Sequence, residues 1–156
     1  MTQTQQNSLE TSQVETFLLK HLGQEVSKVL PIDQGEWSQA FSFQHAAKDY
    51  VIRFGQFGED FRKDQLASTF ATTNLVIPKI TEIGQAFDRY FAISARAFGD
   101  MLEGLNEAKM VAIVPAVFSM LDAIRETDIS STTGYGNWNI RTVAPYQNWQ
   151  SFLLDF

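Results

Sequence analysis

The sequence predicts an α+β fold in which a five-stranded antiparallel sheet with a packed helix is followed by a helical region. Apolar residues alternate along short segments between residues 25 and 96, and they recur at helical spacing beyond Gly99. The 156 residues suffice for a domain with a buried core, and a 44% hydrophobic content with 13 Phe favours a folded chain.

An amphipathic helix is expected first, after a polar start. Ser12 followed by Glu15 is a capping-box pattern, and Gly23 can end the helix. The apolar positions at helical spacing are Val14, Phe17, Leu18 and Leu22.

Five strands should form the sheet. They are expected at residues 26–32, 40–44, 50–54, 79–84 and 89–96. The link 46–49 is short enough for a hairpin, and residues 85–88 are a polar turn.

Two longer helices are expected outside these strands. One covers residues 59–73, with Asn74 as a left-handed terminator. The other is capped by Asn106, carries an apolar stripe from Val111 to Ile124, and is expected to kink at Pro115. In the last 27 residues, only the stretch 148–154 could be helical.

Composition excludes several classes of function. The net charge of −6, without a basic stripe, argues against nucleic-acid binding. The absence of cysteine excludes disulfides and thiolate chemistry, and it favours a cytoplasmic location. No secretion signal is evident, and the longest apolar run, residues 110–118, is too short for a membrane span.

Four collinear segments then resemble aminoglycoside phosphotransferases, and the hygromycin B branch most closely. They are DQGEWSQAFSF at 33–43, YVIRFG at 50–55, LVIPKITEIG at 75–84 and FAISARAFG at 91–99. Further segments at 121–128, 133–138 and 148–153 extend the resemblance over nearly the whole chain. The resemblance implies a protein-kinase-like small lobe followed by the first helices of the large lobe.

On this basis the chain divides into three parts. Residues 1–24 are a tail and helix, residues 25–96 the nucleotide-binding small lobe, and residues 97–156 a hinge with an incomplete start of the large lobe. Only the N-terminal half of such a kinase is covered, so we expect a truncated chain.

The resemblance implies that the turn from Gly35 to Gln39 covers the phosphates of ATP. Gly35 lets the backbone approach, and Ser38 can donate a hydrogen bond to anionic oxygens, with Gln39 completing the loop. The alternative is an ordinary hairpin loop.

Arg53 stands where kinases place the lysine that contacts the phosphates and pairs with an acid on the next helix. By alignment that acid is Asp64, with Glu59 and Asp60 left open. Alternatively, Arg53 is a strand cation that extends to solvent. Asp64 alternatively belongs to a solvent-exposed face of the helix, without a functional role.

Ser94, Ala95 and Arg96 fall where the family strand enters the hinge that holds the adenine edge. The alternative is the end of an edge strand. Trp138, Tyr146 and Trp149 are interpreted as packing residues, with no functional role assigned.

Residues for phosphoryl transfer itself are missing from the sequence. The family loop H-G-D-x-x-x-x-N does not occur, and His21 and His45 both lie in the small lobe. We therefore expect no catalytic and no metal-binding residue in this chain, with the Mg²⁺ ligands in the absent part.

The sequence leads to two functional hypotheses. The first is the ATP-binding part of an enzyme that phosphorylates an aminoglycoside-like hydroxyl compound, inactive by itself. The second is a non-catalytic nucleotide- or protein-binding module. Either could self-associate through an exposed interlobe face, and the acceptor cannot be named from the sequence.

Overall fold

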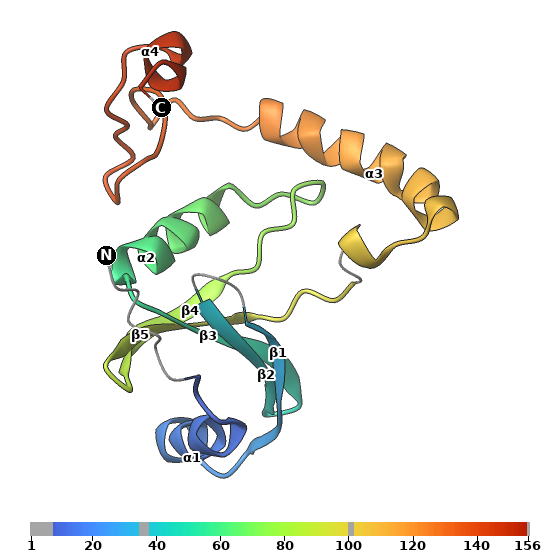
Figure 1. The fold of residues 1–156 in the computed structure, drawn as a ribbon, viewed down its shortest axis with the longest axis vertical. Coiled ribbons are helices and arrows are strands. Elements are labelled where there is room, and N and C mark those ends of the chain that lie inside the picture. Colours follow the sequence, from blue (N-terminus) through green and yellow to red (C-terminus); the bar gives the residue numbers. More distant parts are fainter. Residues whose placement is uncertain (1–7, 35–37, 100–101, 156) are drawn as a thin grey trace. The chain divides into compact units, whose positions relative to one another are not determined.

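The computed structural model describes residues 8–34, 38–99 and 102–155. Figure 1 shows its elements in chain order. They are α1 (Thr11–Leu22), β1 (Val26–Gln34), β2 (Ser38–His45), β3 (Lys48–Gly55), α2 (Gly58–Ala67), β4 (Ile80–Ala86), β5 (Arg89–Ala95), α3 (Glu107–Arg125) and α4 (Trp149–Leu153), with short 3-10 helices at Ser68–Phe70 and Leu102–Gly104.

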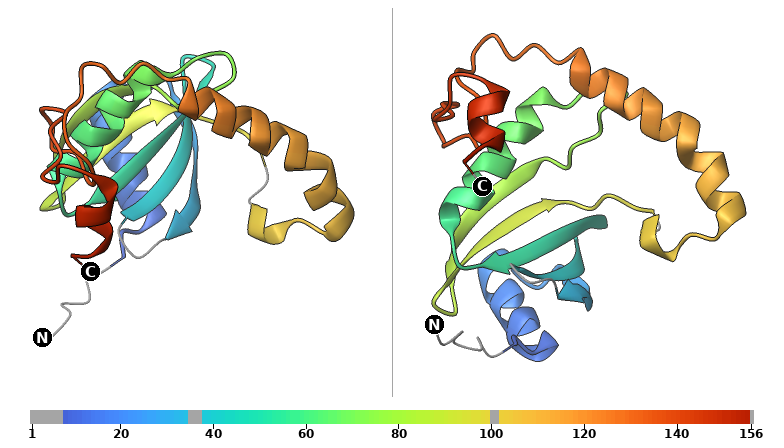
Figure 2. Two further views of the ribbon diagram at one scale, coloured as in Figure 1. Left: turned by 90° about the horizontal axis from the view of Figure 1, so that it is seen from above. Right: turned by 45° about the horizontal axis from the view of Figure 1, so that its top comes forward.

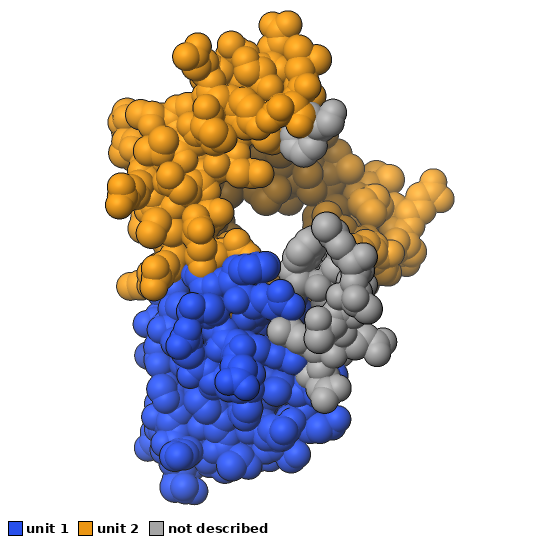
Figure 3. All heavy atoms as spheres, turned by 60° about the vertical axis from the view of Figure 1, so that its left-hand side comes forward, with its two compact units in different colours: residues 1–58, 80–96 blue, residues 59–79, 97–156 orange. Residues whose placement is uncertain are grey.

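The chain forms two compact units, coloured separately in Figure 3. Unit 1 comprises residues 1–58 and 80–96, and unit 2 comprises residues 59–79 and 97–156. The boundary after Arg96 coincides with the end of the expected small lobe, whereas residues 59–79 group with the later part of the chain.

Unit 1 contains the expected five-stranded antiparallel sheet, with strand order β1-β2-β3-β5-β4. All five strands are confirmed, and most extend one to three residues beyond the predicted limits. The hairpin between β2 and β3 is also confirmed, because His45 pairs with Lys48 and leaves Ala46 and Ala47 as its two-residue turn.

Both turn residues have left-handed backbone conformations, with φ of 49° at Ala46 and 61° at Ala47. Asn and Gly adopt this conformation at lower cost than alanine. We therefore expect Ala46→Asn combined with Ala47→Gly to raise the free energy of unfolding by about 1 kcal/mol. Urea denaturation measures this change in the free energy of unfolding. Ala67→Gly, at a φ of −56°, is the control and should destabilise the chain.

The core of unit 1 lies between α1 and one face of the sheet (Figure 2). Val14 and Leu18 of α1 are fully buried there. Their sheet partners are Phe41, Phe43, Ile52, Phe54, Phe91 and Ile93. Aromatic side chains thus fill most of the space beneath the helix, as the high Phe content indicates.

The start of α1 differs from the prediction. Glu10 is the N-cap, and its N–H donates to Gln13 Oε1 at 2.9 Å. Ser12 lies inside the first turn, where its carbonyl oxygen accepts from the Thr16 hydroxyl at 2.8 Å. The end at Gly23 is confirmed, since this glycine has a φ of 95° and its N–H donates to Leu19 O.

Helix α2 is shorter than predicted and gives way to a 3-10 turn after Ala67. Asn74 is not the left-handed terminator, because its φ is not positive. The loop is instead closed by Thr72, whose N–H donates to Leu75 O at 2.9 Å and whose hydroxyl accepts from Leu75 N–H at 3.1 Å.

In unit 2, α3 begins at the predicted cap: Asn106 Oδ1 accepts from the Lys109 N–H at 3.0 Å. The helix continues through Pro115 without a break, and the expected kink there stays a prediction. Asn148 caps α4 in the same way, through the Ser151 N–H at 2.8 Å. The expected helices are therefore confirmed.

The segment before α4 folds back on itself. Tyr135 and Tyr146 exchange two backbone hydrogen bonds. Gly134 has a φ of 77°, and a Cβ at this position would clash with the Ala144 carbonyl oxygen, so only glycine fits.

Within the described residues, no helix combines the length and apolar character that crossing a membrane requires.

Candidate functional site

Arg53 lies on the sheet face opposite α1. Its strand neighbours Ile52 and Phe54 are buried in the core under α1, and side chains alternate along a strand, so Arg53 points to the other face. Arg53 pairs in register with Ala40 of β2 and Ala92 of β5. The half-buried guanidinium-bearing side chain is thus flanked on both sides by methyl groups.

The middle of this face is small or aliphatic, and Tyr90 lies opposite Gly55 at one end of it. Ser42, Val51 and Ser94 form the next row in register across β2, β3 and β5. Ser42 is buried and donates its hydroxyl to Leu30 O at 3.4 Å, while Ser94 is buried in β5. Arg53 thus lies beside a buried row of small side chains, and its guanidinium can neutralise an anion.

The predicted phosphate loop is described only in part. Gly35 lies outside the described residues. Ser38 is the first residue of β2, pairs with Gly55, and is half-buried. It shares its strand face with Ala40 and therefore with Arg53, as a phosphate-contacting hydroxyl would require.

Gln39 requires a correction, because its amide is already used within the chain. Its Oε1 accepts from the Leu9 N–H at 2.8 Å, and its Nε2 donates to Leu9 O at 2.8 Å and to the Ser8 hydroxyl at 3.0 Å. The side chain is buried on the α1 side of β2, away from the face of Arg53. We therefore do not place its side chain at a phosphate.

The hinge prediction concerns the end of β5. Ser94 pairs with Val51 on one side and Ile80 on the other, so its backbone is enclosed between two strands. The Arg96 N–H donates to Asp49 O at 3.1 Å. Ala95 is exposed and lies one residue beyond the last pair with β4. Of these three residues, it is the one with no β4 residue beside its backbone.

The acid predicted to pair with Arg53 belongs to unit 2, whereas Arg53 belongs to unit 1. Asp64 is half-buried in α2. Glu59 is exposed and forms an ion pair with Lys63, with 3.5 Å between carboxylate oxygen and Nζ. The pairing of Arg53 with Asp64 stays a prediction, with Glu59 and Asp60 as the alternatives.

Three aromatic residues of the C-terminal segment are in packing contacts. Trp138 lies 5.8 Å from Phe70 between ring centroids, and Trp149 packs against Tyr135 at 5.7 Å. The Tyr146 hydroxyl donates to Asp155, and this hydrogen bond raises the pKa of Tyr146. These contacts support the interpretation of the three residues as structural.

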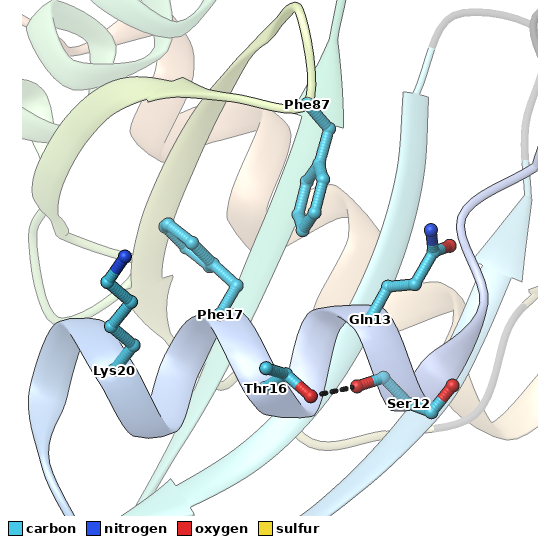
Figure 4. A pocket seen from close by; sticks show the side chains of 6 residues that line it. All are labelled: Ser12, Gln13, Thr16, Phe17, Lys20 and Phe87. Atoms are coloured by element: carbon cyan, nitrogen blue, oxygen red, sulfur yellow. Dashed lines mark hydrogen bonds between the residues drawn. The ribbon is translucent and has the colours of Figure 1, made fainter.

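A hollow of about 460 Å³ lies on the α1 side of unit 1. Figure 4 shows the side chains of Phe17 and Phe87 pointing toward each other among the residues that line it. Its lining residues are Ser12, Gln13, Thr16, Phe17, Lys20 and Phe87. None of them was predicted as a site residue, because α1 carries no local binding motif.

A second hollow, of about 450 Å³, lies in unit 2 between residues 69–74 and 123–128. Beside it, the Ser130 N–H donates to Asp128 Oδ1 at 2.9 Å, which lowers the pKa of Asp128. This hydrogen bond fixes the turn that follows α3.

No group of three or more His, Asp or Glu side chains that could hold a metal ion occurs in the described part of the chain. His21 Nε2 lies 2.5 Å from Glu82 Oε1, and the His21 ring stacks on that of Phe17. This histidine thus joins α1 to β4.

No protein-family model matches the sequence. A search of curated proteins finds Hygromycin-B 4-O-kinase of Escherichia coli, which is 33% identical over 147 residues, or 93% of this chain and 43% of the relative. The predicted resemblance to aminoglycoside phosphotransferases is therefore confirmed.

Solved structures give the same result. Aminoglycoside phosphotransferase APH(4)-Ia superimposes with a TM-score of 0.86 at 32% identity, over 94% of this chain and 50% of the other. A thermostable mutant of this phosphotransferase, in ternary complex with AMP-PNP and hygromycin B, superimposes with a TM-score of 0.82 at 34% identity. The match covers 90% of this chain and 48% of the other. The chain thus spans about half the length of the relatives it matches, and the small-lobe fold is confirmed.

Proposed function

We propose that this chain is the ATP-binding part of a small-molecule kinase similar to aminoglycoside phosphotransferases. The observation that carries the proposal is Arg53: a half-buried cation beside small side chains on the sheet face opposite α1, in the fold of kinases that bind AMP-PNP. The parent enzyme would transfer the γ-phosphoryl group of ATP to a hydroxyl of an aminoglycoside-like acceptor.

In this proposal each part of the unit 1 face has a role. Arg53 neutralises phosphate oxygens, and its planar guanidinium can contact two oxygens at once. Ser38, on the same face, donates to a phosphate together with the backbone around Gly35. Ala95, past the end of the pairing with β4, offers its backbone to the adenine edge.

The transfer step needs groups that the described residues do not supply. A hydroxyl-orienting Asp and the ligands of Mg²⁺ are required in kinase-type transfer. The described part of this chain holds no cluster suited to a metal, so these groups would come from the other half of the kinase. The chain by itself would then bind nucleotide without turning it over.

A non-catalytic binding module is the second candidate, and the exposed apolar side chains of unit 2 favour it. In its protein-binding form this module predicts no specific affinity for ATP. Nucleotide binding therefore distinguishes the enzyme part from a protein-binding module.

The test is a titration with AMP-PNP and Mg²⁺ by isothermal calorimetry, with and without the complementary half of a relative. We expect Arg53→Ala to weaken binding about 10- to 100-fold, because hydrogen bonds to charged groups contribute about 1.5–3 kcal/mol. Arg53→Lys should weaken it less, since the charge is retained.

Arg62→Ala is the matched control, since Arg62 is an exposed arginine of α2 and should leave binding unchanged. Circular dichroism checks that the Arg53 variants stay folded. Equal affinities in the Arg53 and Arg62 variants, or loss of folding on Arg53→Ala, would count against the proposed role.

A further inference from the structure

The amide side chain of Gln39 joins two segments of unit 1 that lie about thirty residues apart in the sequence. Its Oε1 accepts from the Leu9 N–H at 2.8 Å, and its Nε2 donates to Leu9 O at 2.8 Å and to the Ser8 hydroxyl at 3.0 Å. The amide thus pairs with both backbone groups of Leu9, as a residue of a neighbouring strand would. Gln39 and Leu9 are each 8% exposed, so these hydrogen bonds are largely shielded from water.

Leu9 is held in place from two sides. Its side chain belongs to the hydrophobic core that also contains Val14 and Leu18 of α1. The next residue, Glu10, is the N-cap of α1. Gln39 is therefore bonded to a segment that the core and the beginning of α1 already fix.

Gln39 also occupies a particular place in the sheet. It forms the last pair between β1 and β2, opposite Gln34, and it pairs with Phe54 of β3 on its other side. Ser38 directly precedes it and lies on the face of Arg53. The position of Ser38 relative to Arg53 therefore depends on where the backbone of Gln39 is held.

We infer that Gln39 is a positioning residue for the phosphate site: by holding Leu9 it fixes the start of β2, so that Ser38 stays beside Arg53. This inference deepens the proposed function and rests on it. Gln39 itself does not contact the nucleotide. The end of a strand opens easily when little holds it. The affinity for a ligand then falls with the fraction of molecules in which its site is assembled.

A purely structural role for Gln39 makes a different prediction. Buried polar groups need hydrogen-bond partners, and the bonds to Leu9 could stabilise unit 1 as a whole. Their loss would then weaken the binding of adenosine and of AMP-PNP alike. The positioning role confines the loss to ligands with phosphates, because the adenine edge is assigned to Ala95 in β5.

The experiment titrates the full chain and its Gln39→Leu variant with AMP-PNP and Mg²⁺, and separately with adenosine, by calorimetry. AMP-PNP affinity should fall about 3- to 10-fold, since one hydrogen bond changes a conformational equilibrium by a factor of this order. Adenosine affinity should stay within about twofold, because its site is separate. Hydrogen exchange at the start of β2 should become about threefold faster or more.

Gln44→Leu is the matched control for the substitution. Gln44 lies in the same strand, and its Nε2 donates to Asp49 Oδ1 at 3.1 Å near the hairpin to β3. This variant should keep AMP-PNP affinity within about twofold of the parent chain. Leu18→Ala controls for lost stability: Leu18 is fully buried in α1, so its truncation should lower the urea midpoint and leave the ratio of the two affinities unchanged.

Deletion of residues 2–9 removes the partners of Gln39 and leaves Gln39 in place. The shortened chain should lose AMP-PNP affinity to a similar extent. Gln39→Leu in the shortened chain should then cause no further loss, because both changes remove the same hydrogen bonds. Circular dichroism checks each variant, and if either single change prevents folding, the other provides the comparison between AMP-PNP and adenosine.

Equal losses for AMP-PNP and adenosine would assign Gln39 a structural role and overturn the inference. Unchanged AMP-PNP affinity in Gln39→Leu, a further loss in the shortened chain, or unchanged exchange at the start of β2 would also overturn it. In all these cases the parent chain still binds AMP-PNP, and the proposed function stands. A parent chain that does not bind AMP-PNP would overturn the proposed function and this inference together.

Discussion

Phe54→Ala is expected to lower the free energy of unfolding of unit 1 by about 3–5 kcal/mol. The Phe54 side chain is 1% exposed and lies at the centre of the aromatic core. Its ring centroid is 5.7 Å from that of Phe87, 6.3 Å from those of Phe17 and Phe91, and 6.4 Å from that of Phe41. Truncation would leave a cavity bounded by four rings that cannot all move inward.

The matched control is Phe57→Ala, three residues further along the chain. Phe57 is 58% exposed, so its truncation should change stability by less than about 0.5 kcal/mol. Urea denaturation followed by far-ultraviolet circular dichroism measures both variants. Similar shifts for the two phenylalanines would mean that the core is not centred under α1.

The strands could be predicted because side-chain alternation and burial coincide in them. In β3 the alternation of Ile52, Arg53 and Phe54 is enough to place the arginine on the face opposite the core. The strand ends could not be predicted as well. Ser38 and Lys48 extend their strands through backbone pairing, which depends on a partner strand and leaves no mark in the local apolar pattern.

The end of α2 shows how local hydrogen bonds override periodicity. The apolar spacing continues through Phe70, which predicts a longer helix. The Ser68 and Thr69 hydroxyls instead donate to the carbonyl oxygens of Gln65 and Leu66, each at 2.7 Å. Such bonds compete with helix propagation, and here the regular helix ends at Ala67.

The candidate site was predictable only where it follows strand geometry. Arg53 and Ser38 share one face, although the sequence placed only Arg53 in a strand and assigned Ser38 to a turn. Gln39 could not be assigned, because its partners Ser8 and Leu9 are about thirty residues away and carry no signal that points to it. A long-range hydrogen-bonded amide of this kind is visible only once the fold is known.

The contrast between the two units predicts a large difference in hydrogen exchange. Amides of β3, paired on both sides over a buried core, should exchange at least about 1,000-fold more slowly than those of α3. Helix α3 has no buried residue, so little packing opposes its opening.

Hydrogen exchange is measured by mass spectrometry with and without the complementary kinase half. The comparison separates the stability that α3 has in this chain alone from the stability that it gains on binding that half. Binding of that half should slow exchange in α3 about 100-fold or more and leave β3 nearly unchanged, because it would add apolar contacts to the exposed side chains of α3. Slow exchange in α3 without a partner would mean that the helix is stable without further cover, and its exposed apolar side chains would then need another explanation.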